Sequence, residues 1–303
     1  MKAMIEDVRR LTAPGRYIVA VSGGVDSVVL LDILAQIDGL ELVVAHFDHG
    51  IRSESSEDEQ FVKALATDRG LGFVSAAGQL GRDASENIAR RARYEFLRQA
   101  AEQHQARAII TAHHRDDVLE TIILNLQRGT GSKGLSSLQS SEALLRPLLE
   151  YGKHDLLEYA QLRNLSWRED ETNGDTRYAR NRVRHQVLPK LSDADKVQFL
   201  RTSQKASKLN AEISHLVEAY LATQPSETVL ERGQYKALPQ EVGYEVLVQW
   251  LRRETDVEVS WAMIARLDTA VRQGRNSSQV DVARGWSLYL QRDEVVLQHA
   301  GDK

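Results

Sequence analysis

A glycine-rich turn between an apolar strand and an apolar helix constrains the fold of this chain more than any other feature. Residues 17–21 form a β-branched apolar run that predicts a buried strand, and helical periodicity begins at Val28. Between them stands Ser-Gly-Gly-Val-Asp-Ser, from Ser22 to Ser27. The two glycines allow positive φ angles and close approach of a ligand to the backbone. Free amides at a helix start, with serine and aspartate oxygens beside them, predict a phosphate site. An ordinary capped turn is the alternative.

Strand and helix patterns alternate through the first half of the chain. The apolar runs that predict strands lie at residues 17–21, 41–48, 72–76 and 108–112. The segments that predict helices lie at residues 26–37, 54–69, 85–105 and 116–126. This alternation predicts βαβ units and an α/β fold, a doubly wound parallel sheet covered by helices on both faces. Ligands of such sheets bind beyond the carboxyl ends of the strands.

The pattern changes from about Ser192 onward, where a long amphipathic segment predicts a helix to about Tyr220. Further helices are expected at residues 239–254 and 259–272, and short strands at 278–282 and 286–297 with a turn at Arg292-Asp293. A chain of 303 residues is long enough for two modest domains. We predict one domain at residues 1–195 and a smaller, mainly helical domain at residues 196–303.

Composition excludes several classes of function. The chain contains no cysteine, which excludes disulfides, iron–sulfur clusters, thiolate zinc sites and cysteine nucleophiles. No apolar run approaches the roughly 20 residues that span a bilayer, so no membrane partner is expected and a cytoplasmic location is the default. The net charge of −4 argues against a protein that coats nucleic acid, but the arginines are clustered. Local basic stripes predict RNA binding at selected places, with solvated helix faces as the alternative.

Two polar groups follow the early strands. Asp48 and His49 stand at the end of the second strand and are candidate contacts to a nucleotide, although a local turn explains them equally well. Farther along, the three- and four-residue spacing of one helix gives a shared face with two arginines and a tyrosine, which suits RNA. Its alternative is a surface helix held by an ion pair. The residues on this face are Glu86, Arg90, Arg93 and Tyr94.

A dense polar string, His-His-Arg-Asp-Asp-Val-Leu-Glu-Thr from His113 to Thr121, follows the strand at residues 108–112. Acidic residues at a helix start are ordinary dipole partners, but this string has more of them than capping requires. Asp116, Asp117 and Glu120 either hold Mg²⁺ with ATP phosphates or bind and deprotonate an amine. A zinc site is a further alternative, weakened by the absence of an extended ligand pattern.

Two later strings are basic. Arg146 opens Arg-Pro-Leu-Leu, and Arg180, Asn181 and Arg184 lie in a segment where a helix begins. Asn173 stands shortly before that segment, in a turn-rich loop at residues 170–181. Guanidinium groups at a helix start suit a phosphate or a polynucleotide backbone, and each string also has a purely structural explanation.

The turn from Ser22 to Ser27 contains no lysine, so it is not a Walker A loop. It resembles the PP-loop of the ATP pyrophosphatase superfamily, whose members generally cleave ATP between the α and β phosphates. The ordered set of motifs resembles one family of that superfamily, the tRNA(Ile)-lysidine synthetases. The matching segments, within roughly residues 17–190, are Ser22–Ser27, Asp48–Arg52, Glu86–Tyr94, His113–Thr121, Arg128–Gly131, Gly134-Leu135, Arg146–Leu149, Asp170 with Asn173, and Tyr178–Arg184.

The resemblance implies a reaction and its participants. ATP adenylates the carbon-2 oxygen of the wobble cytidine in an isoleucine tRNA with a CAU anticodon, and the ε-amine of L-lysine displaces AMP to form lysidine. Pyrophosphate leaves with Mg²⁺ masking its charge. The product pairs with A instead of G, so the tRNA reads AUA instead of AUG. The resemblance also makes a homodimer an expectation, and the helical second domain is expected to bind tRNA. The chain looks like the short form of the family.

The resemblance assigns roles to individual residues. Asp26 and Asp117 are expected to approach Mg²⁺. The catalytic set is Asp26, Asp116, Asp117 and Glu120. The nucleotide-binding set is Ser22, Gly23, Gly24, Val25, Asp26, Ser27, Asp48 and His49. The set that contacts tRNA or other substrate groups is Glu86, Arg90, Arg93, Tyr94, His113, Arg146, Asn173, Arg180, Asn181 and Arg184.

Three other functions compete with lysidine synthesis as explanations of this sequence. A PP-loop tRNA thiolase typically needs cysteines for sulfur transfer, and this chain has none. An amidotransferase such as GMP synthetase usually pairs the PP-loop with a glutaminase, for which no nucleophile is present. A non-catalytic ATP-sensing or RNA-binding module has no use for the carboxylates at residues 116–120. Within the resemblance itself, Ser132-Lys133 leaves the contacts of the loop at residues 129–137 open.

Overall fold

The computed structural model describes residues 1–48, 55–78, 86–129, 132–136, 138–168 and 179–301. The chain divides into two compact units, Met1–Ser207 and Lys208–Lys303. We describe each unit by itself. None of the helices in these described ranges is long and apolar enough to cross a bilayer.

The first unit is built on a five-stranded parallel sheet with the order β3-β2-β1-β4-β5. Its strands are β1 (Gly15–Ala20), β2 (Leu40–Asp48), β3 (Gly72–Ala77), β4 (Ala108–Ile110) and β5 (Leu144–Leu145). The chain moves outward from β1 in one direction and then returns to start again at β4, so the doubly wound prediction is confirmed. The crevice beyond β1 and β4 is where ligands of such sheets bind.

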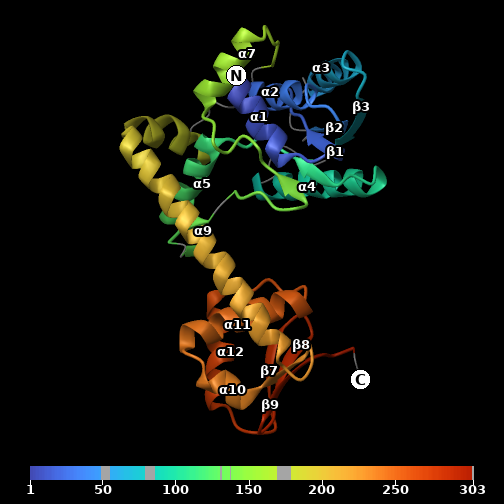
Figure 1. The fold of residues 1–303 in the computed structure, drawn as a ribbon. Helices are drawn as coiled ribbons and strands as arrows, with labels where there is room; N and C mark the ends of the chain where they lie inside the picture. Colours follow the sequence, from blue (N-terminus) through green and yellow to red (C-terminus); the bar gives the residue numbers. More distant parts are fainter. Residues whose placement is uncertain (49–54, 79–85, 130–131, 137, 169–178, 302–303) are drawn as a thin grey trace. The chain divides into compact units, whose positions relative to one another are not determined.

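Helices cover both faces of this sheet because its central strands are apolar on both sides. On β1, Tyr17 and Val19 point to one core, while Ile18 points to the other. Figure 1 shows α1, α2, α3 and α7 on one face and α4 on the other. The helices of this unit are α1 (Lys2–Leu11), α2 (Val25–Leu34), α3 (Ser55–Thr67), α4 (Glu86–Gln103), α5 (Arg115–Gln127), α6 (Ser132–Leu135), α7 (Lys153–Leu162), α8 (Ala179–Arg182) and the first half of α9 (Asp193–Ala222).

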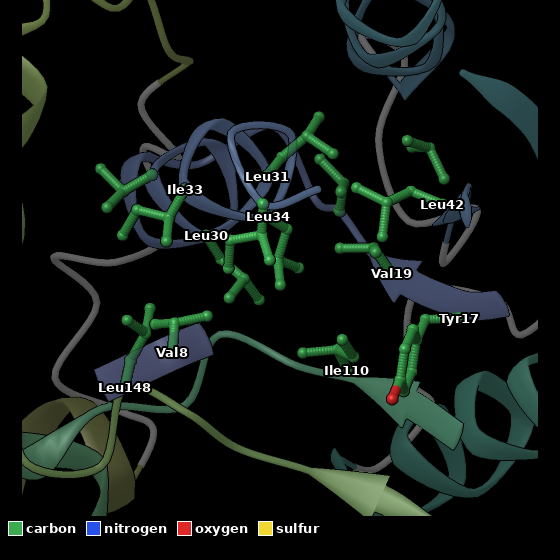
Figure 2. Close-up of a cluster of buried hydrophobic side chains, with 14 of the residues drawn as sticks. Val8, Tyr17, Val19, Leu30, Leu31, Ile33, Leu34, Leu42, Ile110 and Leu148 are labelled. Atoms are coloured by element: carbon green, nitrogen blue, oxygen red, sulfur yellow. The ribbon is translucent and has the colours of Figure 1, made fainter. Parts of the chain in front are cut away.

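The larger core lies between α2 and the sheet. Nine of the ten residues of α2 are buried, and Figure 2 shows Leu30, Leu31 and Leu34 of this helix near Val19 of β1 and Ile110 of β4. Burying one such side chain contributes about 1.5–3 kcal/mol. The start of α2, which carries the glycine-rich turn, is therefore fixed to a rigid part of the fold.

The second unit packs helices against a four-stranded antiparallel sheet with the order β6-β9-β8-β7. Its helices are the end of α9, α10 (Arg232–Ala237), α11 (Gln240–Glu254) and α12 (Trp261–Gln273). Its strands are β6 (Val229–Glu231), β7 (Ser278–Ala283), β8 (Trp286–Leu290) and β9 (Glu294–His299). The prediction of helices followed by short strands is confirmed, with the turn at Arg292-Asp293 between β8 and β9. Strand β6 was not predicted, because its three residues end in a glutamate and, unlike the equally short β4, do not belong to a longer apolar run.

Candidate active site

The turn after β1 closes on itself through its two serines. The Ser22 amide donates a hydrogen bond to the Ser27 hydroxyl at 3.2 Å, and that hydroxyl donates to the Gly24 carbonyl at 2.9 Å. The Val28 amide also donates to the Gly24 carbonyl, at 3.1 Å, which begins helix α2. Gly23 has a φ of 93°. The turn is thus pre-shaped, with a helix start beside it where an anion is favoured.

Gly23 gives a direct test of this geometry. Replacing it with alanine is expected to lower the free energy of unfolding by about 1–2 kcal/mol, because the left-handed region is strained for a residue with a Cβ atom. An added Cβ would have ordinary contacts, with Phe61 and Val62 both at 3.5 Å, so the cost comes from the backbone. Chemical denaturation measures it. Gly233→Ala in α10, where an added Cβ meets nothing within 4 Å, is the control and is expected to be neutral or stabilising. If Gly23→Ala and Gly233→Ala change the free energy of unfolding equally, the backbone at Gly23 does not require glycine.

His114 joins the glycine-rich turn to helix α5. It precedes α5 directly, and its amide donates to the Asp117 carboxylate at 3.0 Å, which caps the helix. Its Nε2 atom lies 3.6 Å from Asp26 on α2 and 3.7 Å from Asp117 on α5. The side chain is only 4% exposed. Two carboxylates that are far apart in the sequence therefore converge on one imidazole.

The charges in this group stabilise one another. Burial disfavours the protonated imidazole, but the contact with Asp26 and the charge of Asp117 outweigh burial and raise the pKa of His114. Burial alone would raise the pKa of Asp26, yet His114 and Lys153 outweigh it and lower that pKa. The pKa of Asp117 is lowered in the same way, by His114 and Arg180 against the effect of burial. Both carboxylates are therefore ionised at neutral pH.

Glu120 is completely buried and paired with two arginines. Its carboxylate accepts a hydrogen bond from Arg180 Nε at 2.7 Å, and one from Arg184 Nη2 at 3.1 Å. The side chain of Glu120 is 0% exposed. Arg180 also donates to Asp117 at 3.1 Å. The predicted acidic string on α5 and the predicted basic string at residues 180–184 thus meet in one network, which their separation in the sequence did not indicate.

Asp116 points to a different neighbour. Its carboxylate accepts a hydrogen bond from the backbone amide of Lys153, the first residue of α7, at 2.9 Å. The Lys153 ammonium in turn lies 2.9 and 3.0 Å from the two carboxylate oxygens of Asp26. Lys153 was not predicted as a site residue. Nothing in its spacing marks it, since the contact with Asp26 spans 127 positions.

A cavity of about 250 Å³ lies beside these groups. Part of its wall is acidic, part is basic, and part is apolar. The lining residues are His114, Asp116, Leu119, Glu120, Lys153, Arg184, Leu188, Pro189 and Lys196. Leu188 follows the π-helical turn η2 (Val183–Val187) and begins the short 3₁₀ helix η3 (Leu188–Lys190). Such a wall suits a small ligand that carries both charges and an aliphatic chain.

His113 lies in a different environment from His114. Its Nδ1 atom is 2.9 Å from the Thr111 hydroxyl. Burial lowers the pKa of His113 to about 3, against the opposing charge of Asp117, and nearby arginines add to the lowering. His113 is therefore neutral at physiological pH. It is suited to hydrogen bonding with a substrate but not to binding phosphate by charge.

The basic face predicted on α4 is present, and its arginines contact the tyrosine on the same helix. The guanidinium groups of Arg90 and Arg93 lie 5.1 and 5.3 Å from the centre of the Tyr94 ring. Burial lowers the pKa of Arg93. Within the described part of the chain, the Nε atoms of Arg93 and Arg146 are buried and have no hydrogen-bond partner. Base stacking on Tyr94 stays a prediction.

The remaining predicted residues are Asp48, Asn181, Glu86, His49 and Asn173. Asp48 ends β2 and is half-buried, and Asn181 is half-buried in α8. Glu86 is the first residue of α4, and the structure describes its backbone only. His49 and Asn173 lie outside the described residues.

The donor set decides which metal fits. Among the described residues, no group of three or more His, Asp or Glu side chains is arranged to hold a metal ion, so a zinc site built only from such protein ligands has no support there. Asp26 and Asp117 supply two carboxylates, which lie 3.6 and 3.7 Å from His114 Nε2. Two carboxylates fit Mg²⁺, which usually takes one or two from the protein and completes its shell with phosphates and water.

Comparison with known proteins gives three results. The model of the PP-loop domain family matches residues 1–191. A curated tRNA(Ile)-lysidine synthase of Geobacter sulfurreducens is 39% identical over 241 residues, which cover 72% of this chain and 51% of that protein. One from Thermus thermophilus is 37% identical over 232 residues, covering 74% of this chain and 45% of that protein. The chain spans about half the length of the curated relatives it matches.

Among solved structures, the U34-tRNA thiolase NcsA from Methanococcus maripaludis, determined with its [4Fe-4S] cluster, has a TM-score of 0.58 and 18% identity. The match covers 68% of this chain and 79% of the thiolase. At this identity the likeness concerns the fold alone.

Proposed function

The chain belongs to the PP-loop domain family, and from that premise we propose that it joins L-lysine to carbon 2 of the wobble cytidine in an isoleucine tRNA with a CAU anticodon, at the expense of ATP. The observation that carries the proposal is the meeting of the glycine-rich turn with the acidic start of α5. Asp26 from the turn and Asp117 from α5 both approach His114, beside a cavity with acidic, basic and apolar walls. The resemblance to curated tRNA(Ile)-lysidine synthases supports the same reaction.

The first step uses the turn. The amides at the start of α2 and the hydroxyl groups of Ser22 and Ser27 bind the phosphates of ATP. The carbon-2 oxygen of the cytidine attacks the α-phosphorus, and pyrophosphate leaves. Asp26 and Asp117 are the carboxylates that would hold Mg²⁺, which when bound would supply neutralisation of the charge that develops on the phosphates. The step converts a poor oxygen leaving group into AMP.

The second step uses the cavity. The ε-amine of lysine attacks carbon 2, and AMP departs with the former carbon-2 oxygen. The attacking amine must be neutral, so a carboxylate of the set Asp116, Asp117 and Glu120 accepts its proton. The apolar part of the wall, at Leu119 and Leu188, suits the methylene chain of lysine. The cationic part suits its α-carboxylate.

The tRNA is proposed to contact basic side chains of the first unit and the helical second domain. Arg90, Arg93 and Arg146 are the candidates on the first unit, together with Arg180 and Arg184. The Nε atoms of Arg93 and Arg146 are buried, so a contact with RNA phosphate would use the outer nitrogens of these guanidinium groups. Residues 1–195 form the proposed catalytic domain and residues 196–303 the proposed tRNA-binding domain. A homodimer remains a prediction, which sedimentation analysis of the purified chain tests.

An incorporation assay tests the proposal. The protein is incubated with ATP, labelled lysine and an isoleucine tRNA transcript, and both RNA-bound label and AMP are measured. We expect label in the RNA in a one-to-one ratio with AMP, and none when ATP or the transcript is omitted. A transcript with the wobble cytidine changed to uridine is the matched control. ATP binding without incorporation would instead identify a nucleotide- or RNA-binding module.

A further inference from the structure

The first residue of α7 supplies a cation that the glycine-rich turn does not contain. We propose that Lys153 is the phosphate-binding lysine of this site, held by Asp26 until the nucleotide arrives, when it moves to the phosphates beyond the α position. The inference rests on the proposed use of ATP and deepens it by assigning a nucleotide-binding residue far from the motif. In a Walker A loop the corresponding lysine stands within the turn itself and reaches the β and γ phosphates.

The position of the ammonium group carries the argument. Lys153 Nζ lies 2.9 and 3.0 Å from the two carboxylate oxygens of Asp26. Asp26 belongs to the first turn of α2, where free amides and the serine hydroxyls also lie. The ammonium is therefore at the edge of the predicted phosphate site before any ligand binds. It needs only to exchange one anionic partner for another.

The helix that carries Lys153 is fixed at its start to α5 and farther along to α2. At its start, the Lys153 amide donates to Asp116 at 2.9 Å. Farther along, the Tyr159 hydroxyl and Arg163 Nε donate to Asp32 of α2 at 2.9 and 3.1 Å. Leu156, Tyr159 and Ala160 pack in the same core as α2. The ammonium is thus brought to Asp26 by a rigid element.

The exposure of Lys153 separates this role from a structural one. Its side chain is 44% exposed and that of Asp26 is 29% exposed, and Lys153 lines the cavity. An ion pair as open as this contributes little to stability. The same openness leaves the ammonium accessible to a ligand. Lys153 therefore contributes little to the stability of the fold, and its position beside the predicted phosphate site suits it to bind the phosphates of ATP.

The test measures ATP and AMP binding to the whole chain by calorimetric titration, in variants Lys153→Met and Lys153→Arg. Loss of one charge-assisted contact predicts that Lys153→Met weakens ATP binding about tenfold to a hundredfold. AMP, which lacks the outer phosphates, is expected to bind as it does to the unchanged protein. Lys153→Arg keeps the charge and is expected to recover part of the loss. Lys63→Met, at an exposed position on α3, is the matched control and is expected to change neither affinity.

Unchanged ATP affinity in Lys153→Met, or an equal loss for ATP and AMP, would overturn the inference. Thermal unfolding of each variant identifies a general loss of structure, and Lys153→Arg then decides the question because it keeps the contact to Asp26. The readout is also separate from the reaction. If the unchanged protein binds ATP but incorporates no lysine, the proposed function fails, while the ratio of ATP to AMP affinity still decides the role of Lys153.

Discussion

Asp117→Asn is expected to reduce lysine incorporation by about a hundredfold or more. This is the usual scale for loss of a general acid or base. The asparagine carbonyl can still accept the hydrogen bond that the His114 amide now gives to Asp117 at 3.0 Å, so α5 keeps its cap. The negative charge shared with His114 and Arg180 is removed. Because Asp117 is buried in the same network as Glu120, some stability is expected to be lost as well, and incorporation is therefore compared at a temperature where the variant remains folded.

Pyrophosphate release and lysine incorporation are measured separately for this variant, with thermal unfolding as a check on structure. Asp195→Asn is the matched control. Asp195 caps α9 in the same manner, accepting from the Ser192 amide at 3.3 Å, but at an exposed position. We expect the control to incorporate lysine normally. If Asp117→Asn releases pyrophosphate and incorporates lysine as the unchanged protein does, the carboxylates have been assigned wrongly.

Glu120→Gln is expected to destabilise the first unit by about 3 kcal/mol, the cost of removing one partner from a buried ion pair. Glu120 is 0% exposed and accepts from both Arg180 and Arg184. A neutral amide would leave Asp117 as the carboxylate of this network that still pairs with both guanidinium groups. The substitution also removes negative charge from the wall of the cavity, so lysine incorporation is expected to fall together with stability.

Chemical denaturation measures this loss, and Glu6→Gln provides the comparison. Glu6 pairs with Arg9 at 3.1 Å on the surface, where the two side chains are 47% and 51% exposed. An exposed pair contributes only about 0–1 kcal/mol. We therefore expect Glu120→Gln to lower the free energy of unfolding clearly more than the chemically identical change Glu6→Gln. Equal losses of unfolding free energy would mean that the buried network contributes nothing beyond a surface pair.

Most of the fold was predictable because its strands are buried on both faces. Tyr17, Ile18 and Val19 point alternately to two cores, so the strand appears in the sequence as one continuous apolar run. Two short strands were not predicted, because neither forms a long apolar run. Strands β5 and β6 contain two and three residues; β4 is also three residues long, but it was found because it lies in the longer run Ala108–Ala112.

The candidate site was predictable only in part. The turn at Ser22–Ser27 and the acidic start of α5 are local patterns, and their meeting follows from adjacent strands β1 and β4. The partners of these groups are not local. Lys153 reaches Asp26 across 127 positions and Arg180 reaches Glu120 across 60. His114 was part of a predicted string, but only packing decides that it, and not His113, faces the carboxylates.

The most direct test of the central claim is the chemical identity of the product. After reaction with ATP and L-lysine, the isoleucine tRNA is digested to nucleosides and analysed by mass spectrometry. We predict that one cytidine, the first residue of the anticodon, gains the mass of one lysine less one water, and that one AMP is released for each modified cytidine. An unchanged wobble cytidine in RNA that had been incubated with an ATP-binding preparation of the protein would contradict it.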